Sequence, residues 1–176
     1  MERIDSETVY EGKLTSVFEA RFRRADGEEV EREVVSHPHA VGIVVHDDGV
    51  VYLVRQPREA VEEDALLEIP AGKLDTDGES PLATAKRELA EEIGMSAEEW
   101  SELKGFYTTP GWADEEVTLF LATGLSGAEA EADDSERIEI VEWPLDDLDG
   151  AIDRCADAKS LVGLLILRER LRAESA

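Results

Sequence analysis

Three glutamates lie close together in one short segment of this 176-residue chain, residues 79–95, which read ESPLATAKRELAEEIGM. On a helix that turns about 100° per residue, Glu88, Glu91 and Glu92 share one face and repel one another. A cation among them would remove this repulsion, and carboxylate oxygens one helical turn apart suit Mg²⁺ or Mn²⁺. The spacing therefore predicts a metal site on a solvent-facing helix face, with an ordinary solvated acidic face as the alternative.

A helix in this segment has clear start and stop signals. Ser80 can cap the first backbone amides, and Pro81 suits the first helical position. Gly94 predicts the end of the helix. Between them, apolar residues repeat at helical spacing and predict a stripe that faces a core: Leu82, Ala85, Leu89 and Ile93.

The pattern around this helix resembles the signature of the Nudix hydrolases. Gly72 is followed by six residues, Glu79, seven residues and then RELAEEIGM at 87–95. The family signature has five residues after the glycine, so this chain carries one extra residue in the loop 73–78. From Glu79 to Met95 the match has no gap. The resemblance implies an α/β fold, the Nudix-type α/β/α sandwich with a mixed β-sheet.

Motifs outside the signature are similar to those of ADP-ribose pyrophosphatases, in which a proline typically follows the signature by about fifteen residues. The matching motifs are His37-Pro38, LVRQ at 53–56 with Arg58, LEIPAGK at 67–73, and Pro110-Gly111 followed by Glu115. The resemblance implies metal-dependent hydrolysis of ADP-ribose, or a similar nucleoside diphosphate sugar, to AMP and ribose 5-phosphate. A Nudix enzyme for another nucleotide and a non-catalytic ADP-ribose-binding module are the alternatives.

The resemblance also implies roles for individual residues around Mg²⁺ or Mn²⁺. Glu88 and Glu92 would be the principal ligands, Glu91 would assist, and Arg87 would orient the glutamates by ion pairing. The remaining candidate ligands are the carbonyl of Ala71 and the side chain of Glu79, the latter structural or acting through water.

The substrate contacts implied by the resemblance come from several segments. Arg58 would clamp the diphosphate, although an ion pair with a surface acid is an equal alternative on sequence alone. The general base would be Asp134 or Glu136. Further candidates for substrate binding are Glu68, Pro110, Trp112 and Glu115, and candidates for stacking on adenine are Phe18, Phe22, Tyr107 and Trp112.

Hydrophobic periodicity and turn residues predict the remaining elements. We expect an antiparallel β-hairpin region at residues 1–36, distinct from a Nudix hydrolase domain at 37–176. Its hairpin joins 17–23 to 30–35 through Asp26-Gly27. The domain would contain strands at 40–45, 50–55, 66–69, 103–108, 117–123 and 138–143, a turn or helix at 96–100, an exposed loop at 124–136, and helices at 145–154 and 160–172.

The charge of the chain excludes several partner classes. Acidic residues number 43 against 18 basic ones, which gives a net charge of −25. A field of this sign repels nucleic acid and anionic membranes. The longest apolar run, 161–167, is too short to cross a bilayer. We therefore expect neither a nucleic-acid nor a membrane partner; the small-molecule substrate is what the resemblance implies.

Cysteine and histidine content bears on the compartment and on other metal sites. Cys155 is the only cysteine, so no internal disulfide is possible, which fits a reducing, cytoplasmic setting. His37 and His39 flank a proline and are expected to be connector residues rather than metal ligands. The resemblance further implies a homodimer that exchanges its N-terminal strands.

The acid load and the scarcity of lysine predict a salt-adapted, halophilic protein, with an ordinary acidic enzyme as the alternative. Self-repulsion acts over about 10 Å at 0.1 M salt and over about 3 Å at 1 M. We therefore expect the melting temperature, measured by circular dichroism, to rise steeply between these KCl concentrations. An unchanged melting temperature would contradict salt adaptation.

Overall fold

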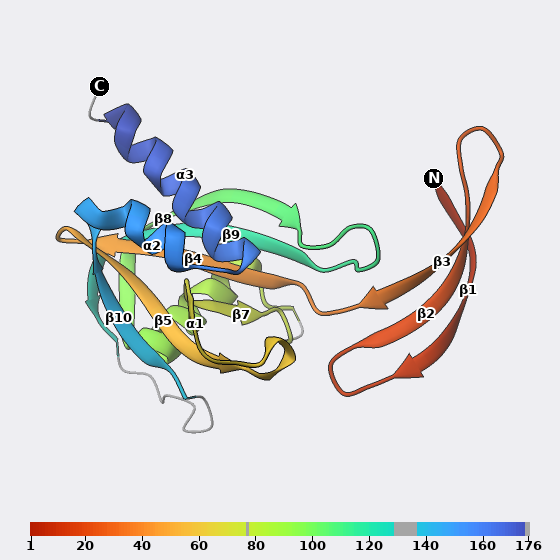
Figure 1. Cartoon of the computed structure of the whole chain (residues 1–176), viewed down its shortest axis with the longest axis horizontal. Coiled ribbons are helices and arrows are strands. Elements are labelled where there is room, and N and C mark those ends of the chain that lie inside the picture. Colours follow the sequence, from red (N-terminus) through yellow and green to blue (C-terminus); the bar gives the residue numbers. More distant parts are fainter. Residues whose placement is uncertain (77, 129–136, 175–176) are drawn as a thin grey trace. The chain divides into compact units, whose positions relative to one another are not determined.

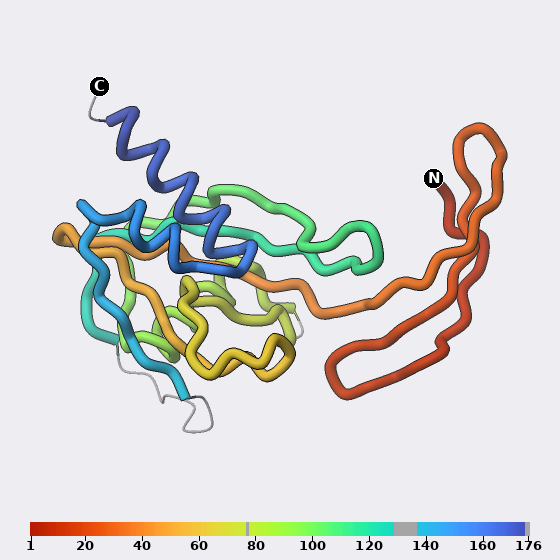
Figure 2. The backbone as a smooth tube through the Cα atoms, viewed as in Figure 1, coloured from red at the N-terminus to blue at the C-terminus, as the bar shows by residue number. Residues whose placement is uncertain are grey.

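The computed structural model describes residues 1–76, 78–128 and 137–174 of the chain (Figures 1 and 2). Contacts divide the chain into two units. The first unit is Met1–His39 with Phe106–Glu116, and the second is Ala40–Gly105 with Val117–Ala176. Within the described ranges, no helix combines the length and the apolar character that a bilayer crossing requires.

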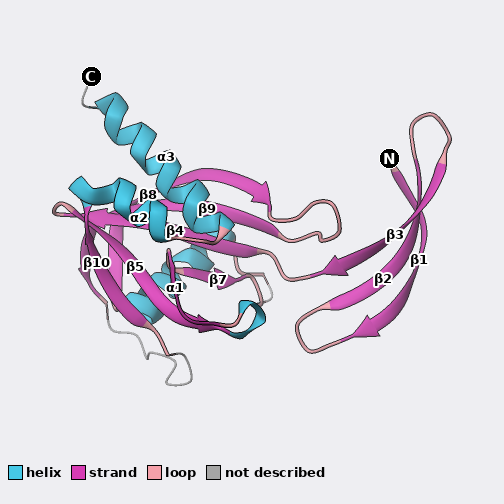
Figure 3. Ribbon diagram, in the orientation of Figure 1, coloured by secondary structure: helices cyan, strands magenta, loops and turns pink. Residues whose placement is uncertain are grey.

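The first unit is built on a three-stranded antiparallel sheet, in the order β1-β2-β3 (Figure 3). The strands are β1 (Glu2–Glu11), β2 (Ser16–Arg23) and β3 (Glu29–Ser36). The hairpin between β2 and β3 confirms the turn predicted at Asp26-Gly27, where Gly27 has a φ of 90°. The full length of β1 was not predicted, because its exposed residues lack a clear apolar alternation.

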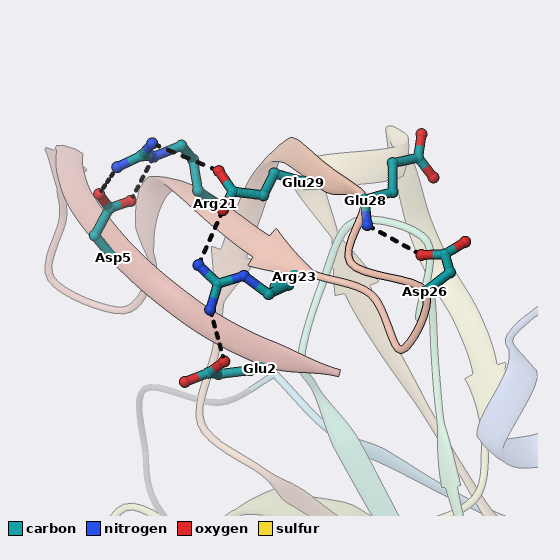
Figure 4. A network of polar contacts seen from close by, with 7 residues as sticks. All are labelled: Glu2, Asp5, Arg21, Arg23, Asp26, Glu28 and Glu29. Atoms are coloured by element: carbon teal, nitrogen blue, oxygen red, sulfur yellow. Dashed lines mark hydrogen bonds and ion pairs between the residues drawn. The ribbon is translucent and has the colours of Figure 1, made fainter.

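Opposite charges face each other across this sheet (Figure 4). Arg21 on β2 lies opposite Asp5 on β1 and forms an ion pair with it. Arg23 lies between Glu2 and Glu29, with N–O distances of 3.3 and 2.9 Å. Cross-strand pairs of opposite charge favour this register, and each contributes little because the side chains are exposed.

The loop from the second half of the chain completes the first unit by pairing with the end of β3. The Val35 N–H donates to the Trp112 carbonyl at 2.8 Å, and the Asp114 N–H donates to the Val35 carbonyl at 3.2 Å. The Asp114 carboxylate accepts hydrogen bonds from Ser36 Oγ at 3.0 Å and from the His37 N–H at 3.2 Å. Nothing in the sequence indicated this pairing, because it joins segments about 75 residues apart.

The second unit contains a seven-stranded mixed sheet, as expected. Its main order is β10-β5-β4-β9-β8, with β6 paired to β5 and β7 paired to β4. The β4 and β9 strands are parallel, whereas β4 pairs antiparallel with β5 and β7. The strands are β4 (Ala40–Asp47), β5 (Val50–Arg58), β6 (Glu63–Glu68), β7 (Ala71–Lys73), β8 (Met95–Tyr107), β9 (Glu116–Gly127) and β10 (Glu139–Pro144).

Helices cover both faces of this sheet, which confirms the α/β/α sandwich (Figures 1 and 3). The helices are α1 (Pro81–Ile93), α2 (Leu148–Arg154) and α3 (Ala158–Glu174), with short 3₁₀ turns η1 (Glu59–Val61) and η2 (Leu145–Asp147). Alternate residues of β4 serve the two faces. Val41, Ile43 and Val45 pack with α1, whereas Val44 faces Gly163 of α3.

Two of the predicted elements were wrong. Residues 96–100 form part of β8 and not a turn or helix. Trp100 packs edge-on against Phe120 of the core, with ring centroids 6.4 Å apart, and this packing outweighs the local preference of the acidic residues for a turn. The loop predicted at 124–136 is wrong over its first residues, because β9 continues to Gly127. Residues 129–136 of that loop lie outside the described residues.

The close approach of α3 to the sheet gives a test of the packing. An Ala in a helix interior is normally more stable than Gly by about 1 kcal/mol. At Gly163 an added Cβ would lie 2.7 Å from Val44 Cγ2, inside the buried core. We therefore expect Gly163→Ala to lower the free energy of unfolding by about 1–3 kcal/mol, measured by urea titration.

Gly127→Ala is the matched control, because a Cβ added there meets nothing within 4 Å. We expect its free energy of unfolding to stay within about 0.5 kcal/mol of the starting protein. Stabilisation by Gly163→Ala would show that α3 does not lie this close to β4.

Candidate active site

Helix α1 presents the acidic residues, and its ends are capped as predicted. Ser80 Oγ accepts a hydrogen bond from the Ala83 N–H at 3.2 Å. Gly94 adopts a left-handed φ of 67°, and its N–H bonds the Ala90 carbonyl at 3.0 Å. Ala85, Leu89 and Ile93 of the expected stripe are buried, while Leu82 is partly exposed. The caps and the stripe fix which face of the helix carries the charges.

The Arg87 guanidinium lies among three carboxylates. Its Nη1 is 2.7 Å from Glu91 Oε2 and 2.9 Å from Glu88 Oε1, and its Nη2 is 3.4 Å from Glu79 Oε2. Burial acts to lower the pKa of Arg87, but the attraction of Glu88 and the hydrogen bonds to Glu91 and Glu79 outweigh it and raise the pKa well above its usual value. Arg87 is therefore a permanent cation that holds these carboxylates together.

Glu92 points inward, contrary to the solvent-facing position we expected. Only 8% of the residue is exposed, and its Oε2 accepts a hydrogen bond from the Ala71 N–H at 3.0 Å. The helical wheel placed Glu92 beside the other acids but could not show that β7 covers it. This bond ties α1 to the first residue of β7.

The surroundings of Gly72 explain why the first residue of the signature is a glycine. Its φ is ordinary, but an added Cβ would lie 2.0 Å from Glu88 Cδ. The Glu88 side chain therefore lies directly over the Gly72 backbone, in space that any other residue would fill. Together with the bond from Ala71 to Glu92, this contact brings the two expected principal metal ligands to the same strand.

The oxygen donors suit a hard divalent cation in kind, and the space over Gly72 admits a carboxylate close to the backbone. Among the described residues, no three acidic, histidine or cysteine side chains form a ready-made metal group. Glu88 pairs with Arg87, and Glu92 bonds the Ala71 amide. Each of these bonds uses one oxygen of a carboxylate that carries two, so both side chains can hold these partners and still offer oxygen to a cation.

A second charged cluster surrounds Glu68, whose side chain is only 3% exposed. Arg58 contacts Glu68 Oε2 through Nε at 2.9 Å and Nη2 at 2.7 Å, while Lys159 Nζ donates to Oε1 at 2.7 Å. Both oxygens of Glu68 are thus engaged by cations, which favours an indirect role over the substrate contact we expected. Arg58 itself is 40% exposed and keeps access to solvent.

Sequence reasoning missed several residues of these two clusters. Thr84 is buried, and its Oγ1 donates to Glu79 Oε2 at 3.0 Å. Asp157 and Ser160 lie beside Lys159 at the start of α3. Lys159 gave no signal, because the predicted helix began at residue 160, whereas α3 begins at Ala158 and places Lys159 in its first turn. For Thr84 no signal existed.

Three of the other predicted site residues belong to the first unit rather than the second. Pro110, Trp112 and Glu115 are part of the first unit. There Glu115 Oε1 lies 3.2 Å from His37 Nδ1, and its Oε2 accepts from Thr108 Oγ1 at 2.8 Å. Asp134 and Glu136, the candidates for the general base, lie outside the described residues.

Aromatic residues of the first unit line a hollow of about 240 Å³. Trp112, Phe22 and Pro110 line it, and Trp112 is 57% exposed. Phe18 and Phe22 each stack against the guanidinium of Arg3. Tyr107 is exposed. Trp112 and Tyr107 are therefore the two of the four stacking candidates that are most exposed to solvent.

A protein-family model described as NUDIX domain matches residues 36–161 of this chain. This span contains α1, Gly72 and both charged clusters, including Lys159.

Three relatives are similar over long stretches. The ADP-ribose pyrophosphatase of Bacillus subtilis is 38% identical, with 97% of this chain and 95% of that protein covered. The methanol dehydrogenase activator of Bacillus methanolicus is 35% identical, with 96% and 94% covered. The ADP-ribose pyrophosphatase of Mycobacterium tuberculosis is 45% identical over 125 residues, with 70% and 60% covered.

A solved structure is also similar. It is titled as the crystal structure of an ADP compounds hydrolase and matches with a TM-score of 0.86 at 26% identity. The match covers 98% of this chain and 95% of that chain.

The contact between Gly72 and Glu88 yields a prediction about metal binding. Gly72→Ala would push Glu88 away from the backbone of β7, because the added Cβ would lie 2.0 Å from Glu88 Cδ. We expect the affinity for Mg²⁺, measured by isothermal titration calorimetry, to fall about 10–100-fold, as for lost supports of metal ligands. Gly127→Ala is the control, with unchanged affinity expected. Equal Mg²⁺ affinities in Gly72→Ala and the starting protein would contradict this position of Glu88.

Proposed function

Since the chain belongs to the Nudix hydrolase family, we propose that it hydrolyses the diphosphate bond of ADP-ribose, or of a similar nucleoside diphosphate sugar. The products would be AMP and ribose 5-phosphate. The single observation that carries this proposal is the unbroken signature from Glu79 to Met95 in a chain 38% identical, over 97% of its length, to an ADP-ribose pyrophosphatase. The match to a solved ADP compounds hydrolase supports it.

Nudix hydrolases generally use divalent metal ions, and we propose Mg²⁺ or Mn²⁺ for this chain. Glu88 and Glu92 would hold the ion with the Ala71 carbonyl, while Glu91 and Glu79 would assist. When bound, the ion would neutralise charge on the diphosphate and acidify a coordinated water. A cation is required to offset the electrostatic repulsion here, because the substrate, the ligands and the protein as a whole are all negatively charged.

Two arginines would position the metal ligands and the substrate around the proposed metal ion. Arg87 keeps Glu79, Glu88 and Glu91 together, and its raised pKa means that it never gives up its charge. Arg58 is a half-exposed guanidinium fixed along one edge by Glu68, which suits it to bind a diphosphate oxygen. The proposed general base remains Asp134 or Glu136.

The proposal extends to the cellular setting and the assembly. Burial raises the pKa of the Cys155 thiol to about 12, so the only cysteine is an inert thiol, which suits a reducing cytoplasm. Val9 and Tyr10 on β1 and Leu14 after it are exposed apolar residues. They support a homodimer formed through the first unit, which light scattering can measure.

Two alternatives are carried forward. One relative is described as a methanol dehydrogenase activator and not as an ADP-ribose pyrophosphatase. The first alternative is therefore a Nudix enzyme for another nucleotide, and the assay includes other nucleotides. A non-catalytic ADP-ribose-binding module is disfavoured, because all the glutamates of the signature are present.

The direct experiment is a substrate panel at high KCl with Mg²⁺, in which AMP release is measured by chromatography. We expect ADP-ribose to be hydrolysed faster than other nucleoside diphosphate sugars, nucleoside triphosphates and dinucleotides. Turnover of none of the nucleoside diphosphate sugars would refute the proposal.

Glu92→Gln tests the proposed ligand while preserving its shape. The amide oxygen of Gln can still accept the bond from the Ala71 N–H, so the melting temperature should change little. We expect kcat to fall by roughly 10³-fold or more through loss of a ligand charge. Glu102→Gln removes the same charge at an exposed position of β8 and should leave kcat unchanged. Equal kcat values for the two variants would exclude Glu92 as a ligand.

A further inference from the structure

We propose that Lys159 is a positioning residue for the reaction, which holds Glu68 in the place from which Glu68 aims Arg58 at the substrate diphosphate. This inference rests on the proposed function, in which Arg58 binds the diphosphate. It assigns a role to the start of α3, a segment that lies outside the family signature.

The Glu68 carboxylate joins a largely enclosed cation to a more exposed one. Its Oε1 accepts from Lys159, whose side chain is 15% exposed, and its Oε2 accepts from Arg58, which is 40% exposed. Arg58 uses Nε and Nη2 for this contact, so the rest of its guanidinium faces outward. Lys159 therefore orients Arg58 indirectly, by holding the Glu68 carboxylate that Arg58 contacts.

The position of Lys159 on its helix is unfavourable unless it serves this contact. Lys159 is the second residue of α3, where the helix dipole repels a cation. Asp157, the residue before the helix, offsets this repulsion by pairing with Lys159. The chain has only five lysines among 43 acidic residues, and one of them occupies this half-enclosed position. Its two ion pairs explain why it is there.

Asp157 fixes the direction of Lys159. Its Oδ2 accepts from the Ser160 N–H at 3.1 Å, as an N-cap residue does, and from Lys159 Nζ at 2.9 Å. The ammonium is thus held between Asp157 and Glu68, which restricts its rotamers. A flexible surface lysine would not transmit position in this way.

Ser160 attaches the same helix turn to the backbone beside Glu68. Its Oγ accepts from the Ile69 N–H at 2.8 Å, and Ser160 is fully buried. The first turn of α3 therefore holds the side chain of Glu68 through Lys159 and the backbone amide of Ile69 through Ser160. Ala71, with its bond to Glu92, follows two residues later.

Removing the ammonium of Lys159 would change how the Glu68 carboxylate orients the Arg58 guanidinium. Glu68 is buried, so an oxygen left without its cation is strongly unfavourable. The only other cation that contacts Glu68 among the described residues is Arg58. Its guanidinium would turn to serve both carboxylate oxygens and would present its outer edge in a different direction. The loss should appear in substrate binding and should depend on Arg58 being present.

A double-mutant cycle tests this dependence. The probe is α,β-methylene ADP-ribose, which cannot be hydrolysed at the diphosphate, and its dissociation constant is measured by calorimetry with Mg²⁺. Lys159→Met keeps the aliphatic stem and should weaken binding roughly tenfold. In an Arg58→Ala background the same change should weaken binding by less than about twofold. Equal losses in both backgrounds would overturn the proposal.

Three controls separate positioning from general damage to the fold. Lys104→Met makes the same chemical change at an exposed position of β8 and should leave binding unchanged. Lys159→Arg retains a cation and should recover most of the affinity. Lys159→Gln is measured in the same cycle, so that the result does not depend on the folding of one variant. A loss in Lys159→Arg as large as in Lys159→Met would also overturn the proposal.

The cycle is repeated with inorganic pyrophosphate, which probes the diphosphate contact without the nucleoside. Coupling with pyrophosphate, together with no binding of the ADP-ribose analogue, would refute the proposed substrate and support the positioning role. Binding of both probes without coupling would refute the positioning role and leave the substrate standing.

Discussion

The accumulation of negative charge around one arginine is the constraint on which the site depends. Glu79, Glu88 and Glu91 all contact Arg87, inside a chain whose net charge is already −25. Carboxylates at such spacing are stable only while a cation shares their space. In the protein without a bound metal ion, the guanidinium of Arg87 is this cation. A divalent cation bound by the neighbouring oxygens would offset the same repulsion during hydrolysis of an anionic bond.

The segment from Glu68 to Gly72 links the two helix layers of the second unit. From one layer, Glu92 of α1 accepts from the Ala71 amide, and Glu88 lies over Gly72. From the other, the first turn of α3 holds Glu68 and the adjacent amide through Lys159 and a buried serine. The short strand that carries the expected metal ligand is thereby positioned from both faces of the sheet, so a shift of either helix would move it.

Local signals in the sequence predicted the elements that depend on local chemistry. Ser80 and Gly94 marked the ends of α1, and Asp26-Gly27 marked a hairpin, because caps and tight turns are decided within a few residues. Features set by distant partners were not predictable. The inward position of Glu92 depends on β7, and the ion pair of Lys159 with Glu68 depends on a residue 91 positions earlier. The pairing of 106–116 with β3 had no local signal.

The most direct measurement is a titration of Mn²⁺ into the nucleotide-free protein at high KCl, in which electron paramagnetic resonance reports the unbound ion. At that salt concentration, weak binding to the acidic surface is screened. We expect saturable binding that disappears in Glu88→Gln and in Glu92→Gln but persists when an exposed acid such as Glu102 is neutralised. Binding that is absent, or equal in all of these proteins, would contradict a divalent-cation site on α1.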